Sequence, residues 1–91
     1  MNKNKRKIIN NDSIDLSTKQ LIDNLNSQLK KKGNHTFTST HEIAGVITEE
    51  YHEMLHELIN NNMENYKQEL LDIAVACLFG VACINQNTLD F

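Results

Sequence analysis

The sequence predicts a small all-α protein. It has 91 residues, no Trp, no Pro and five aromatic residues, two Tyr and three Phe, a composition that gives little support to a β-sandwich or a β-barrel. Leu, Ile, Ala, Glu, Lys and Gln suit helices instead. Because a chain of this length buries only about 60% of its unfolded surface, it supports one core and, at most, one site.

Two capping boxes and an asparagine hinge divide the chain into three helices. Ser17 with Gln20, and Ser39 with Glu42, form the pattern in which a hydroxyl caps a helix and the residue three positions on reaches back. The three Asn at 60–62 predict a break. We therefore expect helices over residues 17–32, 40–59 and 63–85, with the second and third folded as an antiparallel hairpin.

Charge is distributed unevenly along this chain. Residues 1–32 hold eight of the nine basic residues and have a net charge of +5, whereas residues 33–91 have a net charge of −8. We expect a basic flexible arm over 1–15, a helical domain over 16–86 and a short tail over 87–91. The acidic domain needs a cation or the basic segment as a partner, and it makes nucleic acid an unlikely ligand because it repels phosphate.

The third helix is apolar on every side between Ile73 and Ile84. The apolar run is too short to cross a bilayer, which takes about 20 residues, and it contains Asp72. We expect a buried helix and no membrane span. Because one small chain cannot surround such a helix, we also expect a homo-oligomeric bundle, a dimer or a tetramer, in which Ala76 and Gly80 permit close approach of backbones.

Two cysteines lie on this helix. Cys77 and Cys83 are separated by about 9 Å of helical rise, too far to form a disulfide with each other. We expect both to be small core residues of a cytoplasmic protein.

The stretch "EEYHEMLHE" at 49–57 contains two metal-binding patterns. Glu50 and Glu53 fit a magnesium-type carboxylate site, whereas His52, Glu53 and His56 spell the H-E-x-x-H of zinc peptidases. At 100° per residue, both histidines fall opposite the apolar face and Glu50 falls within it. A zinc peptidase also needs a third protein ligand, and none is suitably spaced. We therefore expect His52 and His56 to face solvent.

A second carboxylate pair, Glu69 and Asp72, lies on one face of the third helix. If the hairpin folds at position 61, Glu53 lies level with Glu69 and Glu50 lies level with Asp72. Four like charges at this spacing repel one another by about 4 kcal/mol a pair and require a cation. An all-oxygen cage favours Mg²⁺ or Mn²⁺.

The two motifs, "EEYHE" at 49–53 and "ELLD" at 69–72, resemble those of the MazG-like all-α nucleoside triphosphate pyrophosphohydrolases. The resemblance spans about residues 17–84. It implies Mg²⁺-dependent cleavage of a nucleoside triphosphate to a monophosphate and pyrophosphate. Carried over by motif position, the metal ligands are Glu50, Glu53, Glu69 and Asp72. Glu49 would support these ligands or orient the attacking water.

The chain departs from this family in two respects. Larger members continue with basic residues after the third helix, whereas here no Lys or Arg follows Lys67. Phosphate contacts would then come from Lys30–Lys32, the N-terminal arm or a neighbouring subunit. The motifs also identify no aromatic residue for stacking on a base: Tyr51 and Phe37 are candidates, but such residues are more often structural. Two alternatives therefore stay open: a module that sequesters a nucleotide without hydrolysing it, and a helical interaction protein with an idle acidic cluster.

Overall fold

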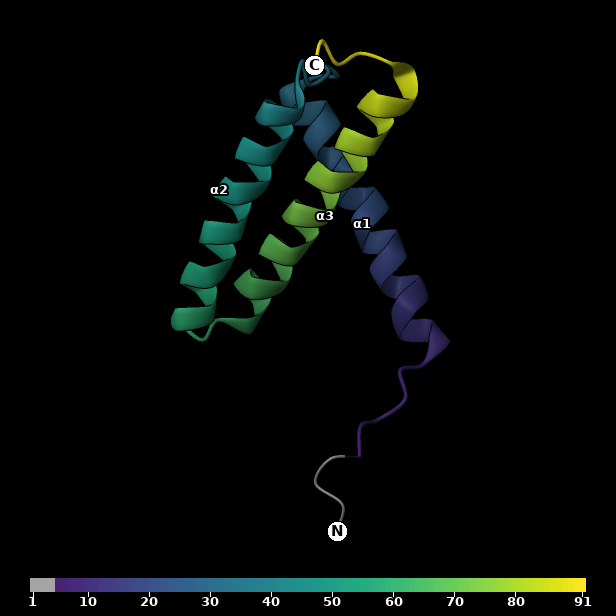
Figure 1. Ribbon diagram of the computed structural model, residues 1–91. Helices are drawn as coiled ribbons and strands as arrows, with labels where there is room; N and C mark the ends of the chain where they lie inside the picture. The colour runs from purple at the N-terminus through teal and green to yellow at the C-terminus, as the bar shows by residue number, and fades with distance from the viewer. Residues whose placement is uncertain (1–4) are drawn as a thin grey trace.

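The computed structural model describes residues 5–91 and contains three helices, α1 (Asn11–Lys32), α2 (Thr40–Ile59) and α3 (Met63–Gln86). Within that range there is no strand. α2 and α3 form an antiparallel hairpin, and α1 crosses α3 obliquely (Figure 1). The all-α class and the helical hairpin predicted from the sequence are confirmed.

α1 begins six residues before the predicted start at Ser17. Asn10 caps it by accepting a hydrogen bond from the Ser13 N–H at 2.7 Å, while the Ser17 hydroxyl donates to the Ser13 carbonyl at 2.7 Å and caps nothing. Residues 11–15, predicted as part of a flexible arm, are therefore helical, and residues 1–4 lie outside the described range. The first nine residues of α1 are exposed, so local capping alone sets this start.

The connection between α1 and α2 follows the predicted signals. Gly33 has a φ of 81°, which a residue with a side chain rarely adopts, and its N–H donates to the Leu29 carbonyl. The buried Ser39 accepts from the Glu42 N–H at 3.1 Å, and the Glu42 carboxylate accepts from the Thr38 N–H at 2.8 Å. The second capping box is thus confirmed, except that the Glu42 carboxylate accepts from the N–H of Thr38 and not from that of Ser39.

Asparagines also form the hinge and both ends of α3. Asn61 has a φ of 56°, and Asn62 caps α3 by accepting from the Asn65 N–H at 3.0 Å. Asn87 ends the helix in the left-handed conformation. The last residues then return to the α1–α2 connection, where the Asp90 N–H donates to the Thr38 carbonyl at 2.7 Å.

The core lies along one side of α3. Its buried members are Val75, Ala76, Gly80 and Cys83. A Cβ on Gly80 would meet the Ile43 side chain of α2 at 3.3 Å. Gly80 was predicted to permit approach between subunits, but here it permits the approach of α2 and α3 within one chain.

The opposite side of α3 is uncovered in the single chain. Leu70, Val81 and Ile84 are 46%, 53% and 60% exposed. Cys77 is exposed as well, so it is not part of the core that the single chain forms. The prediction that this helix is too short to cross a membrane is wrong, because α3 has the length and composition to do so. Core helices of soluble proteins meet the same criterion but are mostly buried, whereas 22% of the apolar window of α3 is buried in the single chain. One chain therefore does not supply the neighbours that this helix requires.

Candidate metal centre

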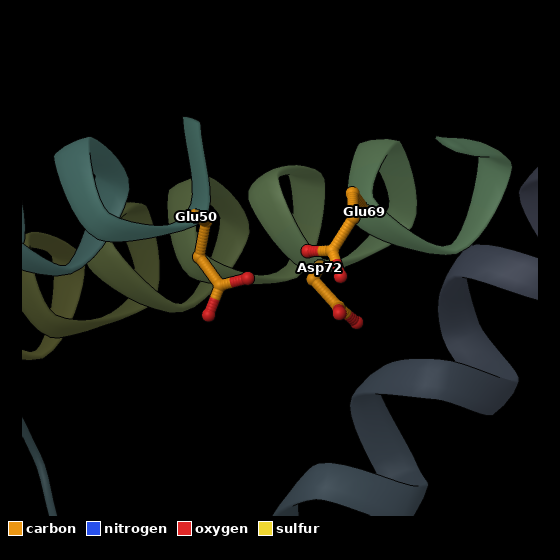
Figure 2. A group of neighbouring side chains, drawn as sticks. All are labelled: Glu50, Glu69 and Asp72. Carbon is orange, nitrogen blue, oxygen red and sulfur yellow. The ribbon is translucent and has the colours of Figure 1, made fainter. Parts of the chain in front are cut away.

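Three carboxylates converge where α2 and α3 face each other. Glu50 projects from α2, and Glu69 and Asp72 project from successive turns of α3, so that one oxygen of each lies within 4.8 Å of the others (Figure 2). The spacing of three residues places the α3 pair on one helix face. The antiparallel hairpin then brings Glu50 to them, as the position of the hinge predicted.

Two oxygens of this group are buried and lack a hydrogen-bond partner among the described residues. They are Oε2 of Glu50 and Oε2 of Glu69, in side chains that are half-buried overall. A buried carboxylate oxygen without a partner costs about 1–3 kcal/mol or more. Because both orphan atoms are oxygens beside a third carboxylate, the group fits a hard divalent cation such as Mg²⁺ or Mn²⁺.

The electrostatics of the three carboxylates also favour a bound cation. Burial, and after it the charges of Glu53 and Asp72, raise the pKa of Glu50, while Glu69 and Lys32 act in the opposite direction. Burial, and after it the neighbouring carboxylates beginning with Glu53, raise the pKa of Glu69 to about 7. The cluster therefore disfavours its own full ionisation unless positive charge is supplied.

Asp72 is held in place by two amides. Asn24 of α1 donates from Nδ2 to Oδ1 of Asp72 at 3.1 Å, and Gln68 donates from Nε2 to the same oxygen at 3.0 Å. These bonds fix the Asp72 carboxylate beside the cluster. The sequence motifs do not single out Asn24, although a helical wheel of α1 places it beside Leu21 and Leu25, where a polar residue requires a partner.

The other predicted site residues lie outside this group of three. Glu53 is exposed, and it acts on the cluster through its charge. Glu49 is exposed too. His52 and His56 are exposed as predicted, so the side chains that the zinc pattern requires lie apart from the half-buried carboxylates.

An aromatic pocket of about 290 Å³ opens beside the cluster, between all three helices and the α1–α2 connection. Phe37 and Phe79 lie in its wall with their rings in edge-to-face contact, 5.2 Å between centroids. Its polar lining comprises Gln28, Lys32, His35, Glu50 and Asp72. Tyr51 is exposed and does not line it.

A polar groove of about 640 Å³ lies on the other side of Asp72, between α1 and the first half of α3. Lys31 and Lys67 line it from opposite helices. The three lysines at the end of α1 are therefore separated: Lys31 lies in the polar groove, Lys32 in the aromatic pocket and Lys30 in neither.

The centre thus consists of an oxygen-only cluster between an aromatic pocket and a polar groove. Apolar surface with a few charged and polar groups is the usual lining of a small-molecule site. Comparisons of the chain with protein-family models, with curated proteins and with solved structures find no match.

Proposed function

We propose that this protein is a Mg²⁺- or Mn²⁺-dependent nucleoside triphosphate pyrophosphohydrolase. The observation that supports it most is the convergence of Glu50, Glu69 and Asp72 within 4.8 Å, with two buried oxygens that lack partners. The MazG-like motifs of the sequence support the same proposal independently of the geometry.

Each acidic residue has a role in this proposal. Glu50, Glu69 and Asp72 hold the cation, and Glu53, which lies close enough to influence Glu69, completes the set. When bound there, such a cation would supply charge neutralisation for the phosphates and a more acidic water. Glu49, exposed to solvent, orients the attacking water and accepts its proton.

The reaction is hydrolysis between the α- and β-phosphates. The water oxygen forms a bond to the α-phosphorus, the bond from that phosphorus to the bridging oxygen breaks, and pyrophosphate leaves. The base occupies the aromatic pocket, whose volume of about 290 Å³ is at the small end for ligand sites. Phe37 and Phe79 contact the base there.

The experiment is a panel of ribo- and deoxyribonucleoside triphosphates with Mg²⁺ or Mn²⁺, followed by measurement of monophosphate and pyrophosphate. Turnover should be lost in Glu50→Gln and Asp72→Asn. The matched control is Asp15→Asn, which removes one exposed carboxylate from α1 far along the chain from the cluster. Phosphate release in place of pyrophosphate, or equal loss in all three variants, would refute the proposal.

Sequestration of a nucleotide without turnover is the second candidate. It is favoured by the position of Glu49, the proposed base, which is exposed and outside the group of three carboxylates. Tight nucleotide binding that depends on Mg²⁺, with no product after long incubation, would select it. If neither binding nor turnover occurs, the helical interaction protein is the interpretation that is left.

A further inference from the structure

The aromatic pocket and the polar groove meet at the metal centre. Gln28 and Asp72 line both hollows, so the two hollows adjoin at Asp72, one of the three clustered carboxylates. The two hollows differ in chemistry, because aromatic and aliphatic side chains line the pocket whereas amides and charged groups line the groove. A ligand with one apolar end and one charged end would therefore bind in a single orientation.

The polar groove presents positive charge and hydrogen-bond donors. Lys31 of α1 and Lys67 of α3 line it, together with the amides of Gln20 and Gln28 on α1. Its acidic residues besides Asp72 are Asp23 and Glu64. Asp23 already pairs with Lys19 at 2.8 Å, so its charge is compensated locally.

Phosphate oxygens are the ligand atoms that such a groove recognises. Ammonium groups from two helices and neutral N–H donors of amides match a chain of anionic oxygens. The cation at the carboxylate cluster would stand at the mouth of the groove, at Asp72. A diphosphate unit in the groove would therefore lie beside Asp72, one of the residues that would hold the cation.

We propose that the polar groove binds the β- and γ-phosphates of a nucleoside triphosphate, with Lys31 and Lys67 as their contacts, while the base lies in the aromatic pocket. This assignment rests on the proposed function. It supplies the phosphate contacts that the sequence lacks after the third helix, and it gives Lys67 a role that the sequence motifs do not indicate. Pyrophosphate then leaves through the groove, and the monophosphate stays in the pocket.

The test uses magnesium pyrophosphate and a nucleoside monophosphate as separate probes, titrated calorimetrically into the full chain. Lys31→Gln and Lys67→Gln should each weaken pyrophosphate binding by about tenfold, because each removes a charge-assisted hydrogen bond. Both should leave monophosphate binding within about twofold. Lys32→Gln, in the aromatic pocket, should weaken the monophosphate instead. Both groove lysines are exposed, so these variants should fold, which thermal melting checks.

Lys30→Gln removes the same charge from the same helix end outside both hollows. If it weakens pyrophosphate binding as much as Lys31→Gln does, the effect is one of overall charge and the inference is overturned. If the nucleotide panel is hydrolysed but both groove variants bind pyrophosphate normally, the proposed function stands and this inference fails. If the panel is not hydrolysed but pyrophosphate binding depends on both lysines, the groove assignment survives the failure of the enzyme proposal.

Discussion

At the residue scale, individual asparagines have specific structural roles that the composition alone does not indicate. Asparagine is so frequent in the sequence that single positions carry little weight there. In the structure Asn10 and Asn62 cap two helices, Asn61 and Asn87 adopt positive φ, and Asn24 donates to Asp72. Each is a position where a short amide that accepts, donates or tolerates the left-handed conformation is physically required.

The carboxylates show what helical periodicity does and does not predict. Periodicity and the hinge correctly place Glu50, Glu69 and Asp72 together, because these relations depend only on 3.6 residues per turn and on the register of the hairpin. Glu53, which falls at the rim of the apolar arc, is exposed. The hydrogen bond from Asn24 comes from α1, whose packing no local pattern specifies.

We predict that Asn24→Ala lowers the affinity for Mn²⁺ by about tenfold, because supports behind a metal ligand typically contribute 10- to 100-fold. Asn24 donates to the Asp72 oxygen at 3.1 Å, and its loss leaves that oxygen with the Gln68 amide as its one remaining support among the described residues. Isothermal titration measures the effect. Asn26→Ala, an exposed position on the same helix, is the control and should bind Mn²⁺ normally. Equal affinities in the two variants would contradict a positioning role.

The raised pKa of Glu69, about 7, predicts how the metal-free protein responds to pH. The folded state holds this proton more tightly than the unfolded state, whose carboxyl has a pKa near 4.5. The contribution of Glu69 to stability is therefore complete below about pH 4.5 and is lost as the pH rises through 7. The shift corresponds to about 3 kcal/mol, which solvent screening reduces to about 1 kcal/mol.

Chemical denaturation at pH 5 and pH 8 measures this loss. Saturating Mg²⁺ should remove most of it, because the cation favours the ionised cluster. Glu69→Gln should flatten the profile without metal. A stability that increases between pH 5 and pH 8 would mean that Glu69 is not held in its protonated form.

At the scale of the elements, features that depend on local signals are predicted correctly, whereas features that depend on tertiary packing are not. The ends of α2 and α3 are correct to within one residue, because capping groups and the hinge are written in adjacent residues. α1 begins earlier than predicted because a helix extends wherever a cap is found, and Asn10 supplies that cap ahead of Ser17. Its oblique path across α3 follows from packing, which the sequence pattern does not contain.

The close contact between α2 and α3 makes a prediction about two glycines. Gly80→Leu should destabilise the protein by about 1–3 kcal/mol, because even a Cβ would come within 3.3 Å of Ile43. Gly45 lies on α2, where an added Cβ would meet nothing within 4 Å, so Gly45→Leu should be neutral or should stabilise by up to about 1 kcal/mol. Urea denaturation compares the two. Equal effects would show that helix propensity, not packing, governs both positions.

At the scale of the whole molecule, one chain forms an extended structure around a thin core. Its radius of gyration is 15.8 Å, compared with about 12 Å for a compact domain of this length. The buried core residues all lie on one side of α3. A helix of this apolarity gains stability only when its other side is covered as well.

The uncovered side of α3 has the spacing of a helix-packing seam. Leu70, Cys77 and Ile84 are seven residues apart, and Val81 lies between the last two at a distance of four from Cys77. All four are exposed in the single chain. Residues repeated in this way pack against another helix of the same kind, so a second copy of this chain fits the seam.

We predict that the protein is a dimer or a tetramer and that Val81→Glu converts it to a monomer, because the buried charge costs more than the remaining contacts return. Light scattering after size-exclusion chromatography measures the mass. Ile59→Glu is the control: Ile59 is 82% exposed at the hinge, away from the seam, and the variant should keep the wild-type mass. A monomeric wild type, or equal dissociation of both variants, would contradict self-association through α3. Flotation of the wild type with phospholipid vesicles, abolished by Val81→Glu, would show instead that lipid covers this side of the helix.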